Sequence, residues 1–338
     1  MNLEFHYYAT AALALRAGFT PEVAHRIARS AEQVDQAIIA YEIDDDGTSY
    51  LSEKTQDYVF WDETVFRDIY LPFHFIPGDE AKARLERLDG AGNPWIVTPD
   101  SPLARELLVS ALRSGNAWRI GIALHAYADT WAHQNFTGRL EAVNELNPRG
   151  GLSAVGALPG VGHLQALTSP DQATEVWIDP RLFSPEIVNR ESFISAARMI
   201  YRYLRTSLHR NFDDEVLVLG ELAEMWERSD LDDKARAFDF TLRYDIEPWN
   251  PKLWSFEAGI SSTSDSDDRA RGYDKLRWLR SEIARRSGRS EGRRRVFTNG
   301  RYTGSELHSW SEAAREHRRE AAALFARRLG GFAELGSK

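Results

Sequence analysis

The chain of 338 residues contains 43% hydrophobic and 11% aromatic residues, enough to bury the core of one large domain or two ordinary ones. Its formal net charge of −9 argues against a large basic face for duplex nucleic acid. The absence of cysteine excludes disulfides and cysteine-ligated zinc sites, so a bound metal would need His, Asp, Glu or backbone ligands. Because there is neither a basic leader segment nor an apolar run of about 18 residues, we expect a cytoplasmic protein without a membrane span.

Helical patterns dominate the chain from its first residues. Residues 3–17 carry apolar side chains at helical spacing, and Thr20 followed by Pro21 is typical of the N-cap and first residue of a second helix. Val-Trp-Ile at 176–178 indicates one short strand. The spacing predicts further helices over 101–114, 116–136, 184–210, 213–229, 232–243, 268–287 and 305–329.

These patterns predict an all-α protein, a multi-helix bundle packed around the helix over 116–136. We expect a single mainly helical domain over 1–338, in which 1–180 carries the metal site and 181–338 completes the bundle. Residues 277–295 contain eight arginines opposed by two glutamates. That composition favours a solvated helix and tail over a patch that attracts a phosphate-bearing partner.

The segment HAYADTWAH places His125, Asp129 and His133 four residues apart on a helix that is apolar on most faces. Ionisable groups on a buried helix must be paired or must hold a metal. The two histidines start about 12 Å apart along the helix axis, so a single ion could not hold all three residues without strain. We therefore expect two ions about 3.5–4 Å apart that share Asp129, with His125 on the first and His133 on the second. The alternative is a buried His–Asp–His hydrogen-bond chain.

Further residues of the metal-ligand type stand in apolar or glycine-rich surroundings. His6 borders the apolar stripe of the first helix, and Asp35 lies beside the stripe of the second. His74 lies in the apolar loop YLPFHFIPG, where a histidine needs a definite partner. His163 follows the glycine-rich GALPGVG, and Asp171 comes eight residues later. Taken alone, His6 is more often a satisfied core or surface residue and Asp35 a surface acid, and the glycines before His163 could be a plain linker.

The order of these residues resembles the all-α superfamily of zinc-dependent phospholipase C and the single-strand-specific nucleases. Three motifs are similar, more closely, to an uncharacterised bacterial family that is catalogued as a domain of unknown function. They are FHYYAT at 5–10, PFHFIPGD at 72–79 and RIGIALHAYADTWAHQNFTG at 119–138. The resemblance covers at least residues 1–180, and the last 150 residues resemble the family only loosely.

The superfamily holds three zinc ions in one cleft, which implies an assignment of the residues above to separate ions. Histidine and carboxylate ligands would suit iron as well as zinc. By position, the first ion would be held by Asp35, His74, His125 and Asp129, the second by His133, His163 and a following acid, and the third by His6 with Asp129.

Two positions depart from the superfamily. Its mature N-terminus is a tryptophan whose amine and carbonyl bind zinc, whereas this chain begins at Met1, five residues before His6. Its second-site acid comes four residues after the histidine, where this chain has Leu167. Asp171 could replace that acid only if the loop after His163 folds back. The first ion site is therefore better supported than the second, and the third is in doubt.

Clustered zinc ions imply a hydrolase of phosphoester bonds, acting on a phosphodiester or phosphomonoester of a nucleotide, lipid headgroup or small molecule. Asp35, which could orient the attacking water, and Asp129, shared between ions, are the catalytic candidates. The main alternative is a non-catalytic metal-binding or interaction module on the same fold, followed by a metal hydrolase of another bond or an oxygen-activating iron protein. No oligomeric state is indicated. Four aromatic residues are candidates for the cleft wall or for ordinary core packing: Tyr7, Tyr8, Phe73 and Trp131.

The stretch EIDDDGTSYLSE, residues 42–53, has acidic residues at several positions of a calcium-binding loop. Glu42 at the first position and Ser49 at the eighth depart from that pattern. An acidic surface turn is therefore the favoured interpretation.

Overall fold

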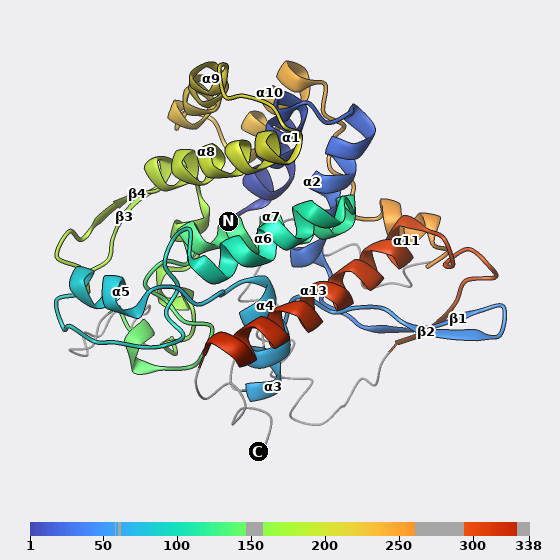
Figure 1. Ribbon diagram of the computed structural model, residues 1–338, viewed down its shortest axis with the longest axis horizontal. Helices are drawn as coiled ribbons and strands as arrows, with labels where there is room; N and C mark the ends of the chain where they lie inside the picture. The colour runs from blue at the N-terminus through green and yellow to red at the C-terminus, as the bar shows by residue number, and fades with distance from the viewer. Residues whose placement is uncertain (58, 60–61, 147–157, 261–293, 330–338) are drawn as a thin grey trace.

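The computed structural model describes all residues except 58, 60–61, 147–157, 261–293 and 330–338 (Figure 1). The predicted helix over 268–287 and most of the arginine-rich stretch lie outside the described residues. Within the described residues, helices form most of the fold and pack around one central helix.

Helix α7, Ala117–Ala132, is the centre of the fold (Figure 1). It starts at Asn116, whose side-chain oxygen accepts hydrogen bonds from the backbone N–H groups of Trp118 and Arg119. Nearly every residue of α7 is buried, as a helix that is apolar on most faces requires. The prediction of a central buried helix is confirmed. The helices that pack around it are α2 (Pro21–Gln36), α6 (Pro102–Ser114), α8 (Asn189–Ser207) and α13 (Glu306–Arg328).

The N-terminal helix begins as a π-helical stretch, η1 (Glu4–Ala9), and continues as α1 (Thr10–Ala17). It ends at Gly18, whose φ of 104° lies in the left-handed region that favours glycine. Helix α2 then starts where predicted, because the side chain of Thr20 accepts a hydrogen bond from the next turn. The π-helical stretch is buried, and short segments of this kind are frequent at functional sites.

Elements from the second half of the chain pack on both sides of this centre. Helix α8 contacts α9 (Glu215–Glu227), and α10 (Asp233–Tyr244) contacts η1. On the α13 side, the buried guanidinium of Arg119 pairs with Glu316 at 2.7 Å and with Glu320. The remaining short helices are α3 (Glu63–Val65), η2 (Phe66–Tyr70), α4 (Leu71–Phe73), α5 (Glu80–Glu86), η3 (Ala142–Asn144), η4 (Leu164–Ala166), η5 (Ser169–Asp171) and α11 (Leu253–Glu257).

The all-α prediction is wrong, because the described residues contain two small sheets. In the first sheet, β1 (Tyr41–Asp45) pairs antiparallel with β2 (Thr48–Leu51) and parallel with β5 (Arg294–Phe297). In the second, the predicted strand β3 (Val176–Ile178) pairs antiparallel with β4 (Glu186–Val188). Strand β4 also takes the first residues of the predicted helix over 184–210, which starts only at Asn189. The fold is therefore mixed, with helices predominating.

The stretch 42–53 forms the β1–β2 hairpin and its turn. Asp46 and Gly47 have φ angles of 51° and 84°, and positive values at both positions suit a two-residue hairpin turn. Asp45 points away from this turn, because it accepts a hydrogen bond from Thr298 Oγ1 at 2.5 Å. The acidic groups thus have separate partners, which supports the interpretation as an acidic turn.

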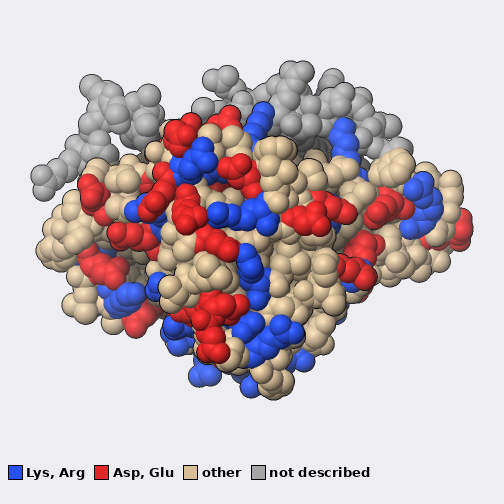
Figure 2. Space-filling model, turned by 90° about the horizontal axis from the view of Figure 1, so that it is seen from above, with Lys and Arg blue, Asp and Glu red and all other residues tan. Residues whose placement is uncertain are grey.

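The face of the molecule seen from above carries acidic and basic side chains intermixed (Figure 2). Among the described residues, no helix combines the length and the apolar character needed to cross a membrane.

Candidate metal centre

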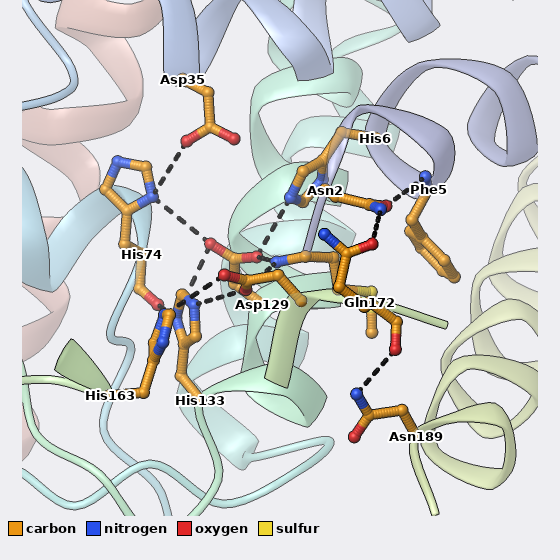
Figure 3. A network of polar contacts seen from close by, with 12 residues as sticks. Asn2, Phe5, His6, Asp35, His74, Asp129, His133, His163, Gln172 and Asn189 are labelled. Atoms are coloured by element: carbon orange, nitrogen blue, oxygen red, sulfur yellow. Dashed lines mark hydrogen bonds and ion pairs between the residues drawn. The ribbon is translucent and has the colours of Figure 1, made fainter. Parts of the chain in front are cut away.

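The eight residues predicted as metal ligands lie in one cluster around Asp129. Figure 3 labels His6, Asp35, His74, Asp129, His133 and His163 of this cluster. They come from η1, α2, α7, the segment after α4 and the segment around η4 and η5, so distant parts of the chain converge there. Three groups each have ligand atoms within 4.8 Å of one another, and the first two share His125. These groups are His6–His125–Asp129, Asp35–His74–His125 and His133–His163–Asp171.

The two oxygens of Asp129 face different neighbours. Oδ2 lies 3.3 Å from both His74 Nδ1 and His125 Nε2, and 3.7 Å from His133 Nδ1. Oδ1 lies 3.1 Å from His6 Nε2. Asp129 therefore joins His6 to the His74–His125 pair. The oxygen closest to His125 and to His133 is the same Oδ2, so the expectation that each of them takes a different oxygen is not met.

Asp35 lies beside the same pair of histidines. Its Oδ1 is 3.8 Å from His125 Nε2 and 3.9 Å from His74 Nδ1, and it accepts a hydrogen bond from Gln56 Nε2 at 3.2 Å. Burial acts to raise the pKa of Asp35, but His125, His6 and His74 outweigh it and lower the pKa. With its side chain 28% exposed, Asp35 is the most accessible residue of the cluster and marks where solvent reaches it.

The loop after His163 folds back, as a role for Asp171 requires. Leu167 has a φ of 54° and a ψ of −125°, a conformation uncommon for a leucine. Its carbonyl accepts a hydrogen bond from His163 Nδ1 at 2.9 Å. Asp171 then lies 3.6 Å from His163 Nε2 and 3.8 Å from His133 Nε2. Leu167 is therefore the turn that brings Asp171 to the cluster.

Backbone carbonyls fix the orientation of three histidine rings. His74 Nε2 donates to Thr55 O at 2.8 Å, and His133 Nδ1 donates to His74 O at 2.7 Å. His163 Nδ1 is fixed in the same way by Leu167. Because a carbonyl can only accept, the proton of each neutral ring sits on that nitrogen, and the opposite nitrogen turns its lone pair toward the cluster. Metal-binding histidines are held by partners of this kind.

His6 and His125 provide a test of whether a metal fits. Among the described residues, neither ring nitrogen of His6 has a hydrogen-bond partner, nor has His125 Nδ1, although both rings are buried. The rings stack with their centroids 3.8 Å apart. Burial, and then His125, lowers the pKa of His6 to about 3, so its ring is neutral at pH 7. Buried neutral nitrogens without partners beside a carboxylate fit a metal site.

The α-amino group of Met1 also lies in the cluster. It donates to Asp129 Oδ1 at 2.5 Å and lies 3.4 Å from Asp171 Oδ1. Burial lowers the pKa of this ammonium, but the two carboxylates outweigh it and raise the pKa to about 10. Burial also acts to raise the pKa of Asp129, yet the ammonium, His133 and His125 hold it well below its usual range. The amine was not among the predicted ligands, although its five-residue distance from His6 places it near the cluster.

The aromatic residues considered for the cleft wall belong to the core instead. Tyr7, Tyr8, Phe73 and Trp131 are all buried. The Tyr7 hydroxyl donates to Glu247 O at 2.8 Å, and Tyr8 Oη accepts from Trp249 N–H at 3.1 Å. Core packing is therefore their role in this fold.

A family model described as a family of unknown function matches residues 1–324. The chain belongs to DUF6765. The match runs far beyond residue 180, so the expectation that the rest of the chain resembles the family only loosely is wrong. The family includes both the metal cluster and the helices that follow it. No curated protein and no solved structure matches the chain.

One further carboxyl group of this DUF6765 protein lies near the cluster and was not predicted. Glu32 stands three residues before Asp35 on α2, so the two share one face of the helix. Burial, and then Asp35, raises the pKa of Glu32 well above its ordinary value. Its Oε1 accepts from Gln36 Nε2 at 2.7 Å, whereas its buried Oε2 has no hydrogen-bond partner among the described residues. The spacing to Asp35 was the signal in the sequence that could have revealed it.

Proposed function

We propose that this DUF6765 protein is a zinc-dependent phosphoesterase in which the cluster around Asp129 holds two or three ions. The observation that carries the proposal is the position of the two Asp129 oxygens, one facing His6 and the other facing His74 and His125. A carboxylate placed between two groups of ring nitrogens is suited to bridging neighbouring ions. Histidine and carboxylate ligands without cysteine suit zinc, and iron is the second candidate.

The three groups of neighbouring ligand atoms correspond to three proposed ion positions. The third would include the Met1 amine, which would bind in its unprotonated form. This distribution resembles that of the zinc-dependent phospholipase C and nuclease superfamily. The proposed ligands are Asp35, His74, His125 and Asp129 for the first ion, His133, His163 and Asp171 for the second, and Met1, His6 and Asp129 for the third.

The chemistry of the site would then depend on Asp35 and Asp129. Bound zinc ions would lower the pKa of a coordinated water toward about 7 and polarise a phosphoryl oxygen. Asp35 is the most exposed ligand, its lowered pKa keeps the carboxylate ionised, and Gln56 holds its Oδ1, so it is suited to orienting a water. Asp129 is buried and would neutralise positive charge between the ions. The proposed substrate is a phosphodiester or phosphomonoester of a nucleotide, lipid headgroup or small molecule.

A non-catalytic metal-binding module is the second candidate, and the burial of the cluster favours it. His6, His74, His125 and Asp129 are almost completely shielded from solvent. Ions closed off by protein ligands are usually structural. A structural ion would stabilise the fold without hydrolysing a phosphoester, which separates the two candidates experimentally.

Elemental analysis of the purified protein beside Asp129→Asn tests the proposal. We expect two or three equivalents of zinc in the wild type and loss of more than one in the variant, because Asp129 belongs to two ion positions. Asp45→Asn is the matched control. Asp45 is also a buried aspartate, but it lies in β1, away from the cluster, and accepts a hydrogen bond from Thr298. It should keep all ions.

Hydrolysis is then measured on the zinc-loaded wild type with bis(4-nitrophenyl) phosphate and 4-nitrophenyl phosphate. If the wild type hydrolyses either compound and Asp35→Asn hydrolyses neither, the result supports a phosphoesterase. Metal binding with no turnover of a wider phosphoester panel would favour the non-catalytic module. A wild-type protein that binds no metal would contradict both candidates.

A further inference from the structure

The turn that carries Asp171 is held by one side chain from another element. Asn189, the first residue of α8, donates from Nδ2 to Ser169 O at 2.5 Å and to Gln172 O at 2.7 Å. These two carbonyls lie on either side of Asp171 in the sequence. The close-up shows the contact between Asn189 and Gln172 (Figure 3). One amide group therefore uses both of its donor hydrogens on the backbone that presents the carboxylate.

The amide of Asn189 is itself fixed. Its Oδ1 accepts a hydrogen bond from Trp177 Nε1 at 3.0 Å, and the side chain is buried. Trp177 in turn stacks on Phe136, with ring centroids 6.4 Å apart. Every donor and acceptor of this amide is thus used, so its orientation is determined.

Asn189 does not serve the usual purpose of an asparagine at a helix start. An N-cap side chain accepts hydrogen bonds from the first turn of its own helix. Helix α8 has Val188 at its N-cap and no side-chain cap. The side chain of Asn189 is directed instead to the η5 turn, which indicates that its contacts serve the turn and not the helix.

The η5 turn needs such support. It is a single 3-10 turn, Ser169–Asp171, and one turn of helix is not stable by itself. The chain enters it through Leu167, whose positive φ is unfavourable for leucine. On its far side, Gln172 contacts Asn2, with Nδ2 of Asn2 3.3 Å from Oε1 of Gln172. The turn therefore keeps its place through contacts with other segments.

We propose that Asn189 is a positioning residue of the metal centre, which sets the Asp171 carboxylate against His133 and His163. The inference rests on the proposed metal centre and adds to it a residue that touches no ion. Without the clamp, the carboxylate would lose its fixed distances of 3.8 Å to His133 Nε2 and 3.6 Å to His163 Nε2. The second ion would then lose Asp171, its one carboxylate ligand among the described residues, while the first ion would keep all four of its ligands.

Asn189→Asp in the full chain is the test, because it keeps the size of the side chain and the acceptor for Trp177. The variant places a carboxylate oxygen where Nδ2 meets two carbonyl oxygens, and like partial charges repel. We expect the affinity for one zinc ion, measured by competition with a chelator, to fall by about 10–100-fold, as for other residues that orient metal ligands. Asp171→Ala should lose the same ion, and Asp45→Asn should lose none.

A second variant covers the case in which Asn189→Asp does not fold. Trp177→Phe removes only the N–H group that orients the amide and keeps an aromatic ring next to Phe136. This variant should lower the affinity for the same zinc ion, by a smaller factor than Asn189→Asp does. Folding of each variant is checked by its thermal unfolding transition.

The zinc titration separates this inference from the proposed function. If both variants bind every ion as tightly as the wild type, Asn189 is not a positioning residue, whatever the wild type hydrolyses. If the variants lose one ion but the wild type hydrolyses no phosphoester, the positioning role stands and the phosphoesterase fails. A wild type that binds no ion at His133 and His163 would overturn the positioning role as well.

Discussion

His6 Nε2 lies 3.1 Å from Asp129 Oδ1, and the two atoms do not form a hydrogen bond. Both groups are buried, and a buried polar nitrogen without a partner is costly. Because the pKa of His6 is lowered to about 3, its ring is neutral near pH 7 and brings no positive charge to the Asp129 carboxylate. A cation shared by the two side chains would relieve it, and this relationship is the strongest sign of an ion on the His6 side of Asp129.

The first prediction concerns His6→Gln. The variant should lose one zinc equivalent and keep the ion held by Asp35, His74, His125 and Asp129, because His6 contacts only the Oδ1 side of Asp129. Elemental analysis after dialysis measures the loss. His25→Gln on α2, outside the cluster, is the matched control and should bind as the wild type does. Equal zinc content in His6→Gln and the wild type would rule out the third ion.

The second prediction concerns an N-terminal extension. A glycine added before Met1 would move the α-amino group away from Asp129 and force an extra residue into a buried position. We expect weaker zinc binding and a lower melting temperature. The control is the same residue added after Lys338. If both chains bind zinc equally, the Met1 amine has no role in the centre.

The third prediction addresses the turn at Leu167. The double variant Leu167→Asp with Asp171→Ala should not recover the second ion, because the Leu167 side chain is 41% exposed and its carbonyl, not its side chain, meets His163. Asp171→Ala alone gives the reference for the lost ion, and Leu167→Asp alone should keep it. Recovery of zinc in the double variant would mean that the loop can present an acid from either position.

The fourth prediction is a pH dependence that needs no metal. His317 is buried, and burial lowers its pKa to about 4, while its Nε2 donates to Pro72 O at 2.9 Å. Between about pH 6.5 and pH 4 the unfolded chain binds a proton that the folded chain does not, so stability falls as the pH falls. At pH 5 His317 alone should cost about 2 kcal/mol relative to pH 7.

Urea unfolding of the wild type and of His317→Gln at both pH values measures this cost. Glutamine keeps an N–H donor for Pro72 and does not titrate, so the variant should lose about 2 kcal/mol less than the wild type on going to pH 5. An equal loss in both proteins would show that His317 does not titrate in this range.

Some of the centre could be predicted from local spacing. His125, Asp129 and His133 recur every four residues on an apolar helix, and that pattern alone indicated a metal or a buried polar chain. His74 and His163 lie in loops, where no periodicity applies; their apolar and glycine-rich surroundings made them candidates, and the resemblance assigned them to ions. Asp171 reaches the cluster only because the backbone folds back at Leu167, and a leucine at that position does not predict such a turn.

The first sheet could not be predicted in the same way. Strand β5 has four residues and pairs with β1, which lies more than two hundred positions earlier in the chain. Pairing between such distant short segments leaves no local pattern, because each strand is too brief to show alternation. Glu32 differs from these strands, since its spacing of three residues from Asp35 on one helix was a local signal of its place near the cluster.

The contact between Asn2 and Gln172, 170 residues apart, has a consequence during synthesis. A ribosome that adds about 5–20 residues per second makes Gln172 roughly 10–30 seconds after Asn2. The four residues proposed for the first ion are all complete once Asp129 has emerged, whereas the second ion must wait for Asp171 and for the clamp at Asn189. On the proposed assignment, all four ligands of the first ion are therefore synthesised before the loop that carries Asp171 and before the clamp at Asn189.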